Sequence, residues 1–547
     1  MRLPDTFAIG SAAAAAATPS VMGAKGWHLA RMAALDLPVP PAFVIGTRHC
    51  PAGDGGGASA EVRAALPELL APVEAATARR VADARCPLLV SVRSGAPASM
   101  PGMMQTLLNV GLSERTLPGL LRVTGNPRLA WDAYRRLIAQ FGEVVARVPV
   151  EAFEDARCAL AGGGDERGLD FAQLRALASR FLAVYREAAG EPFPQDEREQ
   201  LERAVAAVFA SWRSPHAVRY RRAHDIPEVP GTAVIVQAMV FGNAGGRSGA
   251  GVGFTRDPTT GAPALWVDFL ANAQGEDIVS GRRVAHGATQ LATAVPDAWA
   301  GIAAAARQLE HAFGDMQDFE FTVEDGRLYL LQSRAGKRSA LAALRILLDL
   351  HDEGVIDTAT ALTRAEALDP ASLVVARVVA EDGNGLAPLA QAASANTGVA
   401  IGEIALDEAR AQARTDAGAS VVLVRRDAET ADLAALALAQ GLLTQRGART
   451  SHAAVVARQL GTVCLVGCGA LAIDTVARRV HVGSRVLAEG DVVTLDGNTG
   501  SVYAGAARTV AERPLTLLAR LATLMEARGG TRDGHTPAQV DAPVPAR

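Results

Sequence analysis

Two β-strands joined by a tight turn are predicted between Met316 and Arg338, and they constrain the fold more than any other segment. The stretch MQDFEFTVEDGRLYLLQSRAGKR alternates apolar and polar residues, which is typical of strands with one buried face. Asp325-Gly326 in its middle is a hairpin turn signal. Further strands and helices lie on both sides of this hairpin, so we expect a mixed α/β (α+β) fold.

Four polar side chains are expected on one surface of the hairpin. Residues two apart in a strand face the same side, so Asp318 and Glu320 share a face of the first strand. Gln332 and Arg334 share a face of the second strand in the same way. Carboxylates bind Mg²⁺ together with substrate phosphates, and arginine pairs with phosphate oxygens. The pattern indicates a nucleotide site with Mg²⁺; a solvent-facing strand pair with ordinary salt bridges is the alternative.

Three glycine-rich stretches favour the nucleotide interpretation. In MGAKGWHLARM, Lys25 lies between glycines at the start of a predicted helix, where free N–H groups suit an anion. In SVRSGAPASMPGMM, Arg93 ends a predicted strand before a loop that includes Gly102. A third loop, FGNAGGRSGAGVGFTRDPTTG, includes Gly251. Such loops let backbone amides approach phosphates closely, although none has the Walker pattern.

One histidine stands where an Ala/Val-rich helix is predicted to begin. In GARTSHAAVVARQLG, the capping residues Thr450 and Ser451 directly precede His452, and Gly447 lets the loop bend. A phosphate on a histidine at a helix start meets free N–H groups and the positive end of the helix dipole. A structural histidine, a metal ligand and an acid or base are the other interpretations of this residue alone.

The composition restricts the classes of protein to which the chain can belong. The 547 residues have a net charge of −4 and no basic stripe, so we expect no nucleic-acid partner. No apolar run reaches the roughly 20 residues that span a bilayer, so we expect no membrane association and no signal peptide. Five scattered cysteines favour a reducing, cytoplasmic location.

Four blocks are expected along the chain. The first holds the nucleotide and includes a helical subdomain; the second is a helical linker; the third alternates short strands and helices; the fourth is one helix and a disordered tail. Their predicted ranges are 1–338 (subdomain 113–200), 339–384, 385–507 and 508–547.

Several of these segments together resemble pyruvate, phosphate dikinases. The similarity runs from Lys25 to Gly505 and is carried by VSVRSGAPASMPGMM, GTAVIVQAMVFGNAGGRSGAGVGFTRDPTTG, FLANAQGEDIVSG, MQDFEFTVEDGRLYLLQSRAGKR and GARTSHAAVVARQLGTVCLVGC. The resemblance implies an ATP-grasp nucleotide-binding domain followed by a swivelling β/α phosphohistidine domain. It also implies that ATP, with Mg²⁺ as cofactor, phosphorylates His452.

The resemblance assigns roles to individual residues. Those expected to bind ATP are Lys25, Arg93, Asp318, Glu320, Gln332 and Arg334, with the two carboxylates as Mg²⁺ ligands. Those expected in phosphate-covering loops or on a docking face are Gly102, Gly251, Arg136, Glu276 and Asp277. Those expected around the phosphohistidine are Gly447, Thr450 and Ser451. In plant members the threonine at this place is a regulatory phosphorylation site; here we expect a cap and hydrogen-bond donor.

The chain departs from the family at several positions. Gly447-Ala448-Arg449 stands where the family has Gly-Gly-Met, and Arg449 could add positive charge beside a phosphohistidine. Asp268 replaces a glutamate, Ala250 a phosphate-loop threonine, and Gln105 an aspartate.

The family's barrel for phosphoenolpyruvate (PEP) and pyruvate takes roughly 250 residues, and only one helix and a tail follow Gly505. We therefore expect the chain to phosphorylate its own histidine, with ATP and phosphate giving AMP and pyrophosphate. A separate protein would bind PEP or pyruvate. Two alternatives remain: a phosphotransferase for another acceptor, and a nonenzymatic ATP-binding regulatory subunit. A homodimer is compatible with each.

Overall fold

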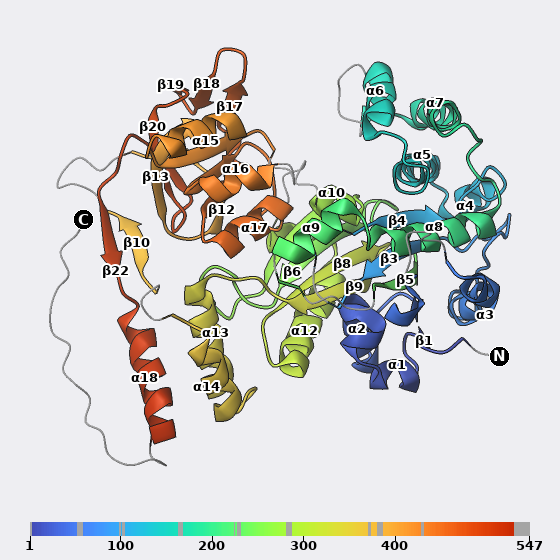
Figure 1. The fold of residues 1–547 in the computed structure, drawn as a ribbon, viewed down its shortest axis with the longest axis horizontal. Helices are drawn as coiled ribbons and strands as arrows, with labels where there is room; N and C mark the ends of the chain where they lie inside the picture. The colour runs from blue at the N-terminus through green and yellow to red at the C-terminus, as the bar shows by residue number, and fades with distance from the viewer. Residues whose placement is uncertain are drawn as a thin grey trace.

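The computed structural model describes residues 3–51, 58–97, 100, 104–161, 168–223, 225–226, 231–279, 287–369, 373–379, 387–427 and 432–529. Two antiparallel sheets carry the N-terminal part of the chain, and an eight-stranded mixed sheet carries the C-terminal part (Figure 1). This multidomain α/β architecture confirms the predicted fold class. No helix in these ranges is long and apolar enough to cross a membrane.

The first sheet has five strands in the order β1-β2-β5-β3-β4, and all of its pairs are antiparallel. Its central strand β5 is buried at every residue, because helices cover both faces. The strands are β1 (Thr6–Ala8), β2 (Ala42–Ile45), β3 (Val90–Gly95), β4 (Thr106–Val110) and β5 (Ala233–Ala238). Helices of this part are α1 (Ala12–Ala16), α2 (Pro19–Ala34), α3 (Ala60–Thr77) and α9 (Pro215–Ala223).

The second sheet has four antiparallel strands in the order β7-β6-β8-β9. The predicted hairpin is β8–β9, and its turn residues Asp325 and Gly326 both have positive φ, 46° and 83°, as a tight hairpin turn requires. Helix α2 contacts β3 and β5 of the first sheet and β9 of the second, so it lies where the two sheets meet. The elements are β6 (Gly249–Phe254), β7 (Trp266–Ala271), β8 (Gln317–Glu324), β9 (Arg327–Ala335), α10 (Gly275–Val279), α11 (Ala288–Ala294) and α12 (Pro296–Phe313).

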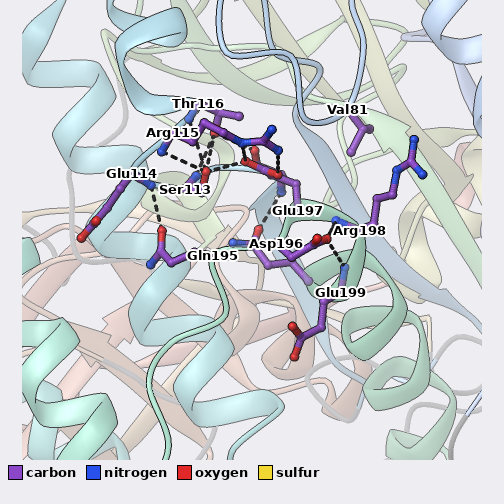
Figure 2. A network of polar contacts seen from close by, with 12 residues as sticks. Val81, Ser113, Glu114, Arg115, Thr116, Gln195, Asp196, Glu197, Arg198 and Glu199 are labelled. Carbon is purple, nitrogen blue, oxygen red and sulfur yellow. Dashed lines mark hydrogen bonds and ion pairs between the residues drawn. The ribbon is translucent and has the colours of Figure 1, made fainter.

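A group of helices follows β4, and an ion pair with a buried carboxylate joins its first loop to its last helix (Figure 2). Glu197 at the start of α8 is fully buried; it accepts a hydrogen bond of 2.5 Å from Ser113 Oγ and pairs with Arg115. Charges are buried only when they are paired, so this cluster fixes the two segments together. The helices are α4 (Leu117–Thr124), α5 (Pro127–Val144), α6 (Val150–Ala161), α7 (Phe171–Ala189) and α8 (Glu197–Ser211), the last extending beyond the predicted limit at 200.

The C-terminal domain is built on a sheet with the order β11-β21-β20-β13-β14-β15-β16-β12, whose central pairs β13–β14, β14–β15 and β15–β16 are parallel. Its strands are β11 (Ala390–Gln391), β12 (Ala393–Asn396), β13 (Val399–Ala405), β14 (Val421–Arg425), β15 (Gly441–Thr444), β16 (Val463–Val466), β20 (Val492–Asp496) and β21 (Ser501–Ala504). A small separate sheet contains β17 (Leu471–Asp474), β18 (Arg479–Val482) and β19 (Arg485–Ala488). The helices are α15 (Glu408–Asp416), α16 (Leu433–Leu438) and α17 (His452–Leu460).

The chain enters and leaves the C-terminal domain along two paired strands. β10 (Val375–Val378) runs antiparallel to β22 (Thr509–Glu512), and Figure 1 shows them together at the edge of the domain. Helix α18 (Leu515–Gly529) then packs against the linker helices α13 (Ala340–Asp352) and α14 (Thr358–Glu366). The predicted last helix is therefore present, and the predicted disordered tail after Gly529 lies outside the described residues.

Candidate functional site

The β8–β9 hairpin brings the four predicted polar residues into two cross-strand pairs. Asp318 lies opposite Arg334, and Glu320 lies opposite Gln332. Arg334 donates from Nε to Asp318 Oδ2 over 2.9 Å, and its Nη2 lies 2.8 Å from the same oxygen. Burial raises the pKa of the Asp318 carboxyl, and the charge of Arg334 acts against this effect. The pairs put carboxylates beside a guanidinium and an amide, as the alternation predicts.

Lys25 and Arg93 reach the same place from α2 and β3. Burial lowers the pKa of Lys25 to about 8, the charge of Glu320 raises it, and the charge of Arg93 lowers it further. Burial also lowers the pKa of Arg93, while Glu320 opposes the shift. The cations are therefore gathered around carboxylates that stabilise them only in part, which is the electrostatic character of an anion-binding site.

A close contact between glycines holds the start of this helix on the end of β3. Gly23 has φ of 71°, and a Cβ there would lie 1.7 Å from the carbonyl oxygen of Gly95. The next residue, Ala24, donates its N–H to Ala96 O over 3.0 Å. Helix α2 is interrupted at Gly23, so Lys25 lies two residues after the break rather than at its first residue. Only glycine permits this approach, which places Lys25 beside the strand that carries Arg93.

Gln237 on β5 belongs to the same place, although the sequence analysis did not select it. Its side chain is 2% exposed, and its Nε2 has no hydrogen-bond partner among the described residues. It lines a small cavity with Lys25, Leu29, Arg93, Ile235, Leu331 and Gln332. The only sequence signal was an amide within the apolar run AVIVQAM. A buried polar group normally has a partner, so a polar residue in a buried strand points to a binding role.

A second charged cluster joins α5 to α10. Arg136 Nη1 lies 3.3 Å from Glu276 Oε2, and its Nη2 lies 3.0 Å from Asp277 Oδ1. Gln140 also donates to Glu276. Burial raises the pKa of Glu276, and Arg136 acts against this effect. The structure thus joins Glu276 and Asp277 to Arg136, and the charge of Glu276 extends to Arg93 at the first cluster.

Two glycines that were expected in phosphate-covering loops have different outcomes. Gly251 is in the middle of strand β6, not in a loop, and a Cβ there would lie 2.0 Å from the ring of Phe321. Packing against this ring is the physical reason for the glycine and corrects the expectation. Its neighbour Ala250 is fully buried in the same strand. Gly102 lies outside the described residues.

Helix α17 begins at His452, as predicted. Ser451 is its N-cap, and its Oγ accepts from Ala454 N over 3.4 Å. Gly447 has φ of 123°, which only glycine adopts readily, so it allows the bend before the helix. Thr450 is buried and does not act as the cap. The His452 side chain lies outside the described part of the chain.

The start of α17 rests on the second sheet of the N-terminal part. The Arg449 guanidinium lies 4.0 Å from the centroid of the Trp266 ring, and its Nη2 lies 3.8 Å from Asp268 Oδ1. Arg458, further along the helix, lies 5.2 Å from the centroid of Phe254. The charge of Arg458 lowers the pKa of Asp318, so the helix faces the sheet that carries the hairpin cluster. Trp266 and Arg458 were not predicted from the sequence, because no local pattern indicates a contact between domains.

The carboxylates of the hairpin fit a Mg²⁺ ion that also binds phosphate. No group of three or more His, Cys, Asp or Glu side chains that could hold a metal is found within the described ranges. Mg²⁺ needs only one or two carboxylates when phosphates and water complete its coordination. Asp318, which is 2% exposed, and Glu320 two residues later meet this requirement.

Comparison with known proteins gives two family matches and a set of close relatives. Residues 19–290 match "Pyruvate phosphate dikinase, AMP/ATP-binding domain", and residues 418–500 match "PEP-utilising enzyme, mobile domain". Pyruvate, phosphate dikinase of Clostridium symbiosum is 43% identical over 505 residues, which cover 89% of this chain and 56% of the relative. The enzyme of Rhizobium meliloti (strain 1021) is 41% identical over 525 residues, covering 91% and 57%. Pyruvate, phosphate dikinase 1, chloroplastic, of Oryza sativa subsp. japonica is 39% identical over 494 residues, covering 89% and 52%.

The chain thus spans a little over half the length of these curated relatives. The first matched region contains β6, the strand that pairs with β8 of the hairpin, and the second contains helix α17. Because an ATP-binding domain match is followed by a mobile-domain match, the chain belongs to the pyruvate, phosphate dikinase family.

Proposed function

We propose that this chain transfers a phosphoryl group from ATP to His452, as the nucleotide half of a pyruvate, phosphate dikinase reaction. ATP and phosphate are converted to AMP and pyrophosphate, and His452 retains one phosphoryl group. The observation that carries the proposal is the docking of α17 on the sheet of the hairpin cluster, with Arg449 against Trp266 and Asp268. The acceptor helix therefore starts beside the domain that would hold ATP.

In this proposal the charged residues have different roles. Lys25, Arg93 and Arg334 bind phosphate oxygens. Gln332 and Gln237 line a cavity with Lys25 and Arg93. Asp318 and Glu320 would hold Mg²⁺, which would supply positive charge against the charge developing on the phosphates. Arg136 holds Glu276 and Asp277 at the edge of this cluster. The free N–H groups at the start of α17 stabilise the phosphoryl group on the histidine.

The relatives' names supply the other substrate, pyruvate. We propose that PEP and pyruvate bind at a site outside the two domains described here, and that the C-terminal domain carries the phosphoryl group to that site. The 547-residue chain alone should exchange ATP with AMP in the presence of phosphate and pyrophosphate. It should not form PEP from pyruvate. PEP formation by the purified chain would refute this division.

Labelling of His452 tests the proposal directly. Purified chain with Mg²⁺, phosphate and ATP labelled at the β-phosphate should acquire an acid-labile, alkali-stable label, together with one AMP and one pyrophosphate for each label. The His452→Ala variant should lose the label but retain ATP binding by calorimetry, because no described ATP-site residue changes. Label that persists in this variant would exclude His452 as the acceptor. Bound ATP without any label in the parent chain would favour a regulatory subunit.

A further inference from the structure

Two side chains of opposite charge face each other at the domain boundary. Arg449 lies in the loop before α17, and Asp268 lies on β7. Their side chains come from different domains and approach to 3.8 Å. We propose that Arg449 is a positioning residue that latches the acceptor helix α17 onto the nucleotide domain through Trp266 and Asp268. The proposal rests on the function proposed above and specifies what holds the two domains in the docked arrangement.

The latch combines a ring contact with an ion pair. The Arg449 guanidinium lies over Trp266 at 4.0 Å from the centroid, well within the range of a cation–π interaction. The Asp268 side chain is 5% exposed, so its interaction with Arg449 is little screened by solvent. Thr450 lies against the same carboxylate, and with Arg449 it opposes the effect of burial on the Asp268 pKa. Methionine at position 449 would provide neither the charge nor the planar group.

A second arginine connects the latch to the acceptor. Arg458 Nη2 donates to the backbone oxygen of Arg449 over 2.9 Å, which holds the loop against its own helix. His452 follows Arg449 by three residues and is the first residue of that helix. A movement of the Arg449 side chain away from Trp266 would therefore also move the start of α17. A displaced latch would move His452 without changing the residues that we propose bind ATP.

Other charges also face this contact. Burial lowers the pKa of Arg449, and the charges of Asp268 and Asp257 oppose this effect, so Asp257 belongs to the electrostatic environment of the latch. Arg458 also interacts with the Asp268 charge. The test must therefore distinguish the effect of losing the Arg449–Asp268 contact from the effect of losing one positive charge in this loop. Arg446, three residues earlier in the same loop, is exposed and provides the matched control.

The experiment compares Arg449→Met, Arg449→Lys, Asp268→Asn, the Arg449→Met/Asp268→Asn double variant and the Arg446→Met control. Single-turnover phosphorylation at saturating ATP should fall about tenfold in Arg449→Met, equal to about 1.4 kcal/mol, at unchanged ATP affinity. Arg449→Lys should recover part of the rate, because it keeps the charge but loses the planar stacking group. Arg446→Met should match the parent chain.

Hydrogen exchange and the double variant distinguish a latch from a structural role. Amides of 448–458 and 264–271 should exchange faster in Arg449→Met, while those of β14 and β15 keep their protection. The double variant should be little slower than the slower single variant, since both changes break one contact. Independent, multiplicative rate losses with unchanged exchange would overturn the latch. If the parent chain is never phosphorylated the proposed function fails, but the exchange measurement still decides whether Arg449 holds the domains together.

Discussion

Arg256 and Arg458 are both almost wholly buried, with exposed fractions of 2% and 3%, but their charges are stabilised in different ways. Arg256 lies just after β6 and donates to Glu310 over 2.9 Å and to Glu353 over 2.6 Å. Burial lowers its pKa, but these two carboxylates outweigh burial and raise the pKa above the ordinary value. Its partners lie on α12 and directly after α13, so the cluster ties the nucleotide domain to the linker helices.

Arg458 has no comparable set of partners. Its Nε and Nη1 make no hydrogen bond within the described residues, and burial lowers its pKa. The carboxylates that act against this effect are led by Asp318, which belongs to the other domain. Arg256 is paired with carboxylates that stay beside it, so its removal would leave them without a partner. A buried charge compensated across a domain boundary has a favourable environment only while the domains are docked.

The largest expected effect is on the stability of the Arg256 cluster. Arg256→Met leaves Glu310 and Glu353 without their buried partner and should lower the free energy of unfolding of the nucleotide domain by about 3–5 kcal/mol. Calorimetric and urea-induced unfolding of the full chain measure this loss. A change below about 1 kcal/mol would remove the distinction between the two arginines.

Arg458→Met should have the opposite pattern. Replacing a poorly paired buried charge by an apolar side chain is often neutral or stabilising, so the thermal transition should be unchanged or higher. Phosphorylation of His452 should slow by roughly thirtyfold, equal to about 2 kcal/mol, because the contact across the boundary is lost. Rapid-quench labelling beside thermal melts checks both. A lower melting temperature with proportionate loss of activity would make Arg458 structural, like Arg256.

Lys25 extends the comparison to a cation whose proposed partner is the nucleotide. Burial lowers its pKa from 10.5 to about 8, so in the free chain the ammonium is charged below pH 8 and neutral above it. ATP affinity should therefore fall by up to about tenfold per pH unit as the pH rises above 8. Between pH 8 and 10.5 Lys25 is protonated in the unfolded chain but not in the folded chain. The contribution of Lys25 to the free energy of unfolding therefore increases as the pH rises. Unfolding of the chain through this group thus does not explain the loss of ATP affinity.

Titration calorimetry with a nonhydrolysable ATP analogue from pH 7 to 9.5 measures this dependence. The matched variant Lys25→Met should bind more weakly at pH 7 and lose the additional pH dependence above 8. A parent chain whose affinity is constant across this range would contradict a phosphate contact by Lys25.

The smallest effect is expected at an exposed pair between the linker strands. Arg377 Nε lies 3.2 Å from Glu512 Oε2, and both side chains are more than half exposed. Exposed pairs contribute roughly 0–1 kcal/mol, so Arg377→Ala should change neither unfolding nor labelling measurably. A large change in the labelling rate would show that charges in the linker control the fraction of molecules in which the two domains are docked. Docking would then not depend on the buried arginines alone.

The sequence predicts those parts of the site that depend on local patterns. The common face of Asp318 and Arg334 follows from strand alternation and a turn signal, and the helix start at His452 follows from its capping residues. The roles of these residues in catalysis remain predictions. Gly251 was misplaced because a glycine-rich stretch reads as a loop, whereas here the ring of Phe321 requires the glycine within a strand. Gln237 and Trp266 depend on tertiary contacts that no periodicity encodes.

The paired strands β10 and β22 also place the two ends of the C-terminal domain next to each other, as in an inserted domain. Neighbouring antiparallel strands lie about 5 Å apart, so the whole of 379–508 is inserted between two points that almost touch. A short turn joining Val378 to Thr509 could close the remaining chain, because domains with adjacent ends are tolerated as insertions. The excised segment could in turn be grafted into another host through the same two strands. The two strands β10 and β22 form the whole covalent attachment, so the rest of the domain could be replaced while the attachment stays the same.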